Sequence, residues 1–176
     1  MATSKTRLTE EQMRSLNDEL FDAWNRHDIE GVLQHLQPDV LWVDPTLDEP
    51  AHDKVGAAAS MANTFTAFPD FHLPADDFES FYDVEAQSGM AVWTARGTMT
   101  GRLDTGVPAT GKPVNVRGAT LIRFTDGLIS EYRFMYDALD MMQQMGLLPK
   151  STGVGFKALV MADVVAAKAR KALQRH

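Results

Sequence analysis

The chain contains no cysteine among its 176 residues, which excludes disulfides, thiolate metal sites and cysteine nucleophiles. Long apolar runs are also missing, since none approaches the ~20 residues that span a bilayer. The opening residues, Met-Ala-Thr-Ser-Lys-Thr-Arg, lack the apolar core of a signal peptide. We therefore expect a cytoplasmic protein that does not act at a membrane.

Metal and cofactor motifs are missing as well. The five histidines show no i, i+4 pair of the kind that binds zinc on a helix. The Gly-x-Gly at residues 153–155 follows no strand, so it does not form a phosphate loop. We expect neither a metal nor another cofactor, and keep only His72, at the start of a strand-like stretch, as a minor site candidate.

Charge is distributed unevenly along the chain, whose formal net charge is −7. Residues 150–176 hold six Lys or Arg and one acid, whereas residues 1–149 hold 11 basic and 23 acidic residues. An acidic body repels phosphates, so we expect no nucleic-acid partner. The basic end is either a solvated helix end or a segment that docks onto its own or a neighbouring subunit, as in a homodimer. An apolar stripe over residues 156–167 predicts a helical extension there.

Helical signals dominate the first third of the chain. A capping box at Thr9–Gln12 precedes an amphipathic stretch of about five turns. Asp28 is a typical cap for a second, short helix that Pro38 ends. Residues 39–44 then alternate as a strand, and residues 51–67 are predicted to be helical.

Strand signals dominate the rest of the first 149 residues. Asp126-Gly127 predicts a hairpin, and Asp137 predicts the start of a last short helix, 138–145. The strand-like stretches are residues 71–82, 89–101, 113–124 and 128–136. Helices followed by antiparallel strands indicate an α+β fold with helices on one face of a curved sheet. Such a cone encloses space for a small apolar ligand.

The stretch from Trp42 to Pro50 carries the main candidate for chemistry. Strand alternation places Val40, Trp42 and Asp44 on one face. If that face is buried, a carboxylate lies among aromatic rings at the end of a strand, where it either titrates unusually or takes part in a reaction. The alternative is that Asp44 is an ordinary turn residue before Pro45.

Several motifs resemble those of the SnoaL-like polyketide cyclases, in the superfamily of nuclear transport factor 2, ketosteroid isomerases and scytalone dehydratase. The resemblance covers residues 9–149 and implies a cystatin-like α+β cone, with residues 150–176 as an extension outside it. The motifs are Leu20-Phe21-Asp22-Ala23-Trp24-Asn25-Arg26-His27-Asp28, Gly97-Thr98-Met99-Thr100-Gly101, Pro108-Ala109-Thr110-Gly111-Lys112-Pro113-Val114, Arg123-Phe124-Thr125-Asp126-Gly127, Asp137 and Gln144-Met145-Gly146-Leu147-Leu148-Pro149.

Residues 25–50 are also similar to the start of the ketosteroid isomerases. That resemblance implies that Asp44 removes a proton next to a ketone, and a carboxylate in an apolar cone would have the raised pKa of a usable general base. The isomerases place oxyanion donors at the positions of Leu20 and Thr120, of which Thr120 retains a hydroxyl. Tyr132 and Tyr136 share a strand face with Phe134, and either could supply the missing donor if that face lines the cone.

The resemblance to the cyclases themselves departs at their acid and base positions. Their Asp on the last strand corresponds to Phe134, and their two histidines correspond to Thr120 and Met99. Two hypotheses follow. One is a cofactor-independent isomerase, cyclase or lyase that acts by proton abstraction on a small apolar carbonyl compound such as a polyketide, steroid or terpenoid. The other is a non-catalytic ligand-binding or dimerisation module.

The predicted site therefore has one catalytic residue, Asp44, and a set of substrate-binding residues. The substrate-binding candidates are Trp24, Trp42, Trp93, Met99, Thr120, Tyr132, Phe134 and Tyr136. Of these, Thr120 and a tyrosine are expected to hold the oxyanion, while the others shape the pocket.

Overall fold

The computed structural model describes residues 6–150, 153–155 and 161. Its elements are α1 (Glu10–Asn25), α2 (Ile29–Leu33), β1 (Leu36–Val43), α3 (Lys54–Ala67), the short 3-10 helix η1 (Ala75–Asp77), β2 (Glu79–Asp83), β3 (Ser88–Thr98), β4 (Pro113–Thr125), β5 (Leu128–Tyr136) and α4 (Ala138–Gln144). The predicted α+β fold is confirmed.

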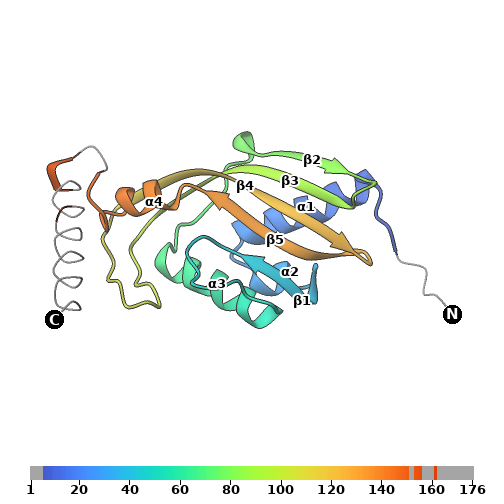
Figure 1. Cartoon of the computed structure of the whole chain (residues 1–176), viewed down its shortest axis with the longest axis horizontal. Coiled ribbons are helices and arrows are strands. Elements are labelled where there is room, and N and C mark those ends of the chain that lie inside the picture. Colours follow the sequence, from blue (N-terminus) through green and yellow to red (C-terminus); the bar gives the residue numbers. More distant parts are fainter. Residues whose placement is uncertain (1–5, 151–152, 156–160, 162–176) are drawn as a thin grey trace, which may run out of the picture.

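One mixed sheet organises the described part of the chain, with strand order β1-β5-β4-β3-β2. β1 runs parallel to β5, and every other neighbouring pair is antiparallel. Figure 1 shows β3, β4 and β5 as long, curved neighbours, with α1 and α3 on one side and α4 at the end of the sheet. The helices thus cover the concave face, and this arrangement creates the interior in which the candidate site lies.

The local signals for helix starts and for the hairpin are confirmed. Thr9 and Gln12 make the reciprocal hydrogen bonds of a capping box, and the Asp28 and Asp137 carboxylates accept from amides of α2 and α4. Between β4 and β5, Asp126 and Gly127 have positive φ values of 51° and 82°. A two-residue turn of this kind matches the twist of the strands that it joins.

Two boundaries differ from the prediction. Pro38 does not end a helix, because it lies inside β1, which begins at Leu36. The strand tolerates it because β1 is an edge strand, where a residue without an amide hydrogen need not break a ladder bond. The predicted strand over residues 71–82 is also interrupted: His72 forms an isolated bridge to Arg96, η1 follows, and regular pairing begins only at Glu79.

Apolar packing between the sheet and α1 to α3 forms the main core. Leu20, Trp42 and Ile122 are fully buried in it, and Trp42 stacks against Tyr132 at 5.0 Å between ring centroids. A smaller cluster around Met99 and Met145 lies beside α4. The core is therefore aromatic near β1 and β5 and rich in methionine toward α4.

His35 gives the fold a pH dependence that can be measured. Its side chain is only 14% exposed, and burial lowers its pKa below 6.5, while Glu19 at 3.4 Å opposes this shift less strongly. The folded state therefore binds fewer protons than the unfolded state just below pH 6.5. This contribution to stability is present above that pH and is lost as the pH falls through the folded pKa. We expect urea midpoints to fall between about pH 7 and about pH 5, and to fall less in His35→Gln. An equal fall in both proteins would assign the effect to other groups.

Residues 150–176, predicted as a basic helical extension, lie almost entirely outside the described residues. No helix in the described part is long and apolar enough to cross a membrane. The homodimer stays a prediction.

Candidate functional site

A cavity of about 440 Å³ lies between the concave face of the sheet and the helices. Its inner part is aromatic, and its outer part is bounded by the loop at residues 103–107 and by α4. The described residues that line it are Asn17, Phe21, Trp24, Asp44, Thr46, Leu47, Asp48, Ser60, Asn63, Thr64, Phe68, Phe71, Leu73, Phe78, Ala91, Trp93, Ala95, Arg96, Leu103, Asp104, Thr105, Val107, Val114, Val116, Tyr132, Phe134, Tyr136, Met141, Met142, Met145 and Leu147. The volume is within the range of cavities that bind small molecules.

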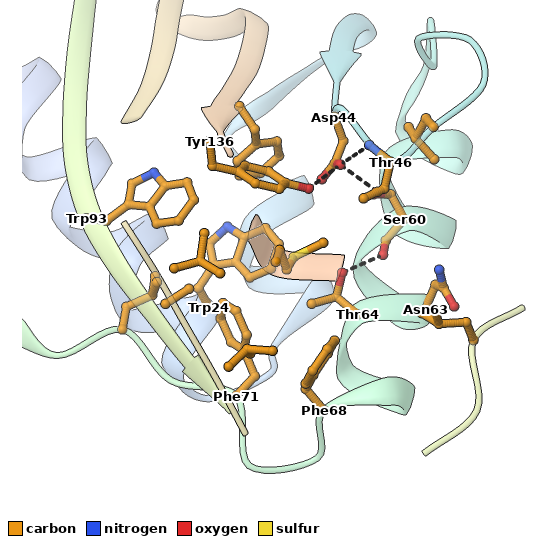
Figure 2. A pocket seen from close by; sticks show the side chains of 18 of the residues that line it. Trp24, Asp44, Thr46, Ser60, Asn63, Thr64, Phe68, Phe71, Trp93 and Tyr136 are labelled. Atoms are coloured by element: carbon orange, nitrogen blue, oxygen red, sulfur yellow. Dashed lines mark hydrogen bonds between the residues drawn. The ribbon is translucent and has the colours of Figure 1, made fainter. Parts of the chain in front are cut away.

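Asp44 is the first residue after β1, and its carboxylate points into this cavity (Figure 2). Three hydrogen bonds converge on one oxygen, Oδ1: the Thr46 amide donates at 2.8 Å, the Thr46 hydroxyl at 2.6 Å and the Tyr136 hydroxyl at 2.7 Å. Asp44 is thus both a turn residue, as the alternative held, and a wall of the cavity. An ionised carboxylate can accept all three bonds.

The second carboxylate oxygen of Asp44 is in a different situation. In the described part of the chain, no donor binds Oδ2, whereas the bonds from Thr46 and Tyr136 fix the orientation of the group. Bonds to Oδ1 restrict rotation of the carboxylate and leave Oδ2 free to accept a proton. The arrangement is suited to a general base with one oriented accepting atom.

Tyr136 contributes a donor that remains protonated. Burial, with the charge of Asp44 as the next cause, raises the pKa of its hydroxyl well above 10. Burial likewise raises the pKa of Tyr132, four residues earlier on the same face of β5. Both phenols therefore act as neutral hydrogen-bond donors across the physiological range.

Trp93 forms the wall on the β3 side. Its indole nitrogen donates to the Thr120 hydroxyl at 2.8 Å, and its ring lies over Gly118 of the paired strand β4. A Cβ at Gly118 would lie 2.5 Å from Cη2 of Trp93. A glycine is therefore required at this point for the indole to lie flat against the sheet.

Gly118→Ala tests this packing. We expect the added methyl group to displace the Trp93 ring and to lower the free energy of unfolding by about 1–3 kcal/mol. Urea denaturation of this variant and of Ala119→Ser, a change at the next position of the same strand, measures the difference. Equal free energies of unfolding in the two variants would show that the Trp93 indole can move aside without loss of stability.

The predicted pocket residues divide into two groups. Trp24, Trp93, Tyr132, Phe134 and Tyr136 line the cavity. The other three do not line it and correct the prediction: Trp42 is covered by Tyr132, Met99 packs in the cluster beside α4, and Thr120 is fully buried with its hydroxyl bonded to Trp93. Thr120 therefore has no surface with which to hold a substrate oxyanion.

The structure adds polar residues that the sequence analysis did not select. Ser60, Asn63 and Thr64 line the cavity from one face of α3, as Figure 2 shows. Asn63 accepts a hydrogen bond from the Asp104 amide at 2.9 Å and so fastens the outer loop to α3. Their i, i+3, i+4 spacing was a signal, but it indicates only that the three share a helix face.

Asn17 is a further addition, from the middle of α1. It is 2% exposed and occupies the face of α1 that also carries the buried Met13, Leu20 and Trp24. The histidine that was kept as a candidate, His72, has an exposed side chain and does not line the cavity. Among the described residues, no group of three or more His, Asp or Glu is arranged to hold a metal ion.

Comparisons with known proteins agree with this architecture. A family model described as SnoaL-like polyketide cyclase matches residues 15–145. AclR from Streptomyces galilaeus, described as a candidate hydroxylase, has 23% identity over 96% of this chain and 99% of its own, with a TM-score of 0.67. A candidate SnoaL-like polyketide cyclase from Jannaschia sp. CCS1 has 20% identity, over 82% of this chain and 99% of its own, with a TM-score of 0.69. IdmH from Streptomyces antibioticus, a candidate polyketide cyclase, has 24% identity, over 76% of this chain and 97% of its own, with a TM-score of 0.60. The comparison with curated proteins gave no match.

Proposed function

Because the chain belongs to the SnoaL-like polyketide cyclase family, we propose that it is an enzyme that removes a proton next to the carbonyl group of a small, largely apolar compound. Asp44 is the general base, and the substrate is a polyketide or a multi-ring ketone of similar size. The reaction is a cyclisation or isomerisation through an enolate. The observation that carries the proposal is the Asp44 carboxylate, held at Oδ1 and free at Oδ2 in an aromatic cavity.

The proton transfer requires two groups on either side of the substrate carbonyl. Oδ2 of Asp44 accepts the proton from the α-carbon, and the electron pair of the broken C–H bond moves to the carbonyl oxygen as the enolate forms. A hydrogen-bond donor within a few ångströms of the base must then stabilise this oxygen. Tyr136 satisfies that requirement because its hydroxyl is 2.7 Å from Oδ1 of Asp44 and stays protonated. As Asp44 gains the proton and loses its charge, the Tyr136 hydroxyl is free to donate to the enolate.

The proposed base, Asp44, follows β1, whereas the cyclase resemblance implied an acid–base residue on the last strand, β5. The last-strand position of the cyclase aspartate is Phe134, whose ring packs edge-on against Trp42 at 5.2 Å and Trp24 at 6.0 Å. Phe134 can only shape the cavity. The carboxylate that faces the cavity next to Phe134 comes instead from the end of β1.

The second candidate function is binding without catalysis. It is favoured by one observation, which is that the family acid and base positions hold Phe134, Thr120 and Met99, none of which titrates. In that case the cavity binds a ligand, and the role of Asp44 is to stabilise the turn by accepting hydrogen bonds from Thr46.

Exchange of α-protons in D₂O separates the two candidates without knowledge of the natural substrate. The protein is incubated with 2-tetralone and with androst-4-ene-3,17-dione, and deuterium uptake is followed by NMR against a buffer blank. Uptake faster than the blank supports the enzyme. Binding of these ketones, seen as quenching of tryptophan fluorescence, with uptake at the rate of the blank supports the binding module.

A further inference from the structure

Helix α3 carries polar side chains on the side that faces the cavity. Ser60, Asn63 and Thr64 line the cavity, and all three are half-buried. Of the four exposed positions of the helix, three are apolar: Val55, Ala59 and Ala62. A surface helix ordinarily has the reverse pattern, with its polar residues toward solvent. The inversion indicates that these polar side chains serve the cavity and not the outer surface.

Two hydroxyl groups on this face have hydrogen-bonding capacity left for a ligand. In the described part of the chain the Ser60 hydroxyl makes no hydrogen bond, and its oxygen is accessible. Oγ1 of Thr64 donates to the Ser60 carbonyl oxygen at 3.1 Å, so its proton is used while its lone pairs can still accept. A ligand hydroxyl can therefore accept from Ser60 and donate to Thr64. Asn63 has a separate task, because its Oδ1 holds the outer loop through the Asp104 amide.

The course of α3 places Ser60 on the wall between Asp44 and the outer loop. Trp42, two residues before Asp44, pairs with Ala51 through backbone hydrogen bonds of 2.8 and 2.9 Å, so the start of α3 lies beside the end of β1. At the other end of the helix, its last carbonyl oxygen accepts from the Gly101 amide at 3.0 Å, at the base of the outer loop. Ser60, in the middle of the helix, therefore follows Asp44 along this wall.

The opposite wall of the cavity has a different character. Figure 2 shows Asp44, Thr46, Ser60 and Thr64 on one side of the cavity, and aromatic side chains on the other, namely Trp93, Trp24 and Phe71. A planar ring system between these walls packs against the aromatic rings with one edge. Its other edge faces the carboxylate and the hydroxyl groups.

We propose that Ser60, together with Thr64, determines specificity by hydrogen-bonding a second oxygen of the substrate, on the same edge of the ring system as the carbonyl group that reacts at Asp44. The inference rests on the proposed function in taking Asp44 as the base. The substrate is accordingly a fused-ring ketone with a hydroxyl group on its carbonyl edge and an apolar opposite edge. A ketone with its hydroxyl group on the other edge would place that group against the aromatic wall and leave Ser60 without a partner from the ligand.

Two isomeric ketones test this assignment. In 8-hydroxy-2-tetralone the hydroxyl group is on the same edge as the carbonyl group, and in 5-hydroxy-2-tetralone it is on the opposite edge. We expect wild type to bind the 8-hydroxy isomer about tenfold more tightly, as measured by isothermal titration calorimetry. Ser60→Ala should lose most of this preference, and Thr64→Val should reduce it. Thr66→Ala is the matched control and should keep the preference, because Thr66 is an exposed residue of the same helix that does not line the cavity.

Thermal unfolding of the same variants distinguishes specificity from structure. Alanine is a better helix former than serine, so the unfolding midpoint of Ser60→Ala should equal or exceed that of wild type. A lower midpoint would assign the hydroxyl to the fold and overturn the proposal. Equal affinity of wild type for the two isomers, an undiminished preference in Ser60→Ala, or no binding of either isomer would also overturn it. Failure of the proposed function reads out differently, as a preserved isomer preference in binding without deuterium uptake above the buffer blank.

Discussion

Asp44→Asn is expected to lower the rate of α-proton exchange about 10³-fold, with ligand affinity changed less than about threefold. The asparagine amide oxygen can accept the same bonds from Thr46 and Tyr136 that Oδ1 accepts now. The amide nitrogen then takes the place of Oδ2, and it cannot accept a proton. The substitution therefore removes the base and leaves the turn and the cavity intact.

Asp48→Asn is the matched control for this experiment. Asp48 follows on the same loop, lines the same cavity and is exposed, but it accepts no hydrogen bond from the tyrosine. Its replacement removes the same charge from the cavity and should lower the exchange rate less than about threefold. Equal losses in the two variants would indicate that the general negative potential matters, and not proton transfer to Asp44. Exchange that persists in Asp44→Asn would remove this residue from the mechanism.

Much of the fold could be predicted because its determinants are local. Thr9, Asp28 and Asp137 cap helices through hydrogen bonds to amides three residues ahead, so a short stretch of sequence contains the whole signal. The position of Pro38 could not be predicted in this way, because whether a strand lies at the edge of a sheet depends on the partners that it finds later.

The sequence predicted which side chains of the candidate site point toward the concave face of the sheet, but not which of them reach the cavity. Alternation placed Tyr132, Phe134 and Tyr136 together, and all three line the cavity. The same reasoning selected Trp42 and Thr120, which share the concave side but are covered by other side chains. Periodicity indicates which way a side chain points, and only packing decides whether a neighbour lies over it.

The polar residues in the helices were missed for a related reason. Asn17 lies on the apolar face of α1 between Leu16 and Leu20, so the helical spacing already indicated a buried polar residue there. A single buried asparagine usually bonds within the fold, and its partners come from other elements, so the sequence of α1 alone does not show what surrounds it. Only the structure shows that Asn17 lies beside Tyr82 of β2 and lines the cavity.

Tyr136→Phe is expected to lower the turnover number about 10²-fold, with little change in KM. The variant keeps the aromatic ring against Trp93, whose centroid is 6.1 Å away, and loses only the hydroxyl that binds Asp44. A donor that acts on the developing enolate is used in the transition state and not in ground-state binding, so its loss lowers kcat and leaves KM nearly unchanged. Steady-state kinetics of α-proton exchange measure both quantities.

Tyr132→Phe provides the comparison, because it removes the same group from the same face of β5, four residues before Tyr136. At about 13 Å along the strand from Tyr136, its hydroxyl is too far from Asp44 to reach an oxygen adjacent to the reacting carbon. We expect this variant to retain kcat within about threefold of wild type, since its hydroxyl is too far from Asp44 to act on the enolate. A larger loss of kcat in Tyr132→Phe than in Tyr136→Phe would place the enolate near Tyr132, and Asp44 could not then be its base. A loss confined to Tyr136→Phe would assign both the base and its oxyanion donor to the junction of β1 and β5, where Asp44 and Tyr136 meet.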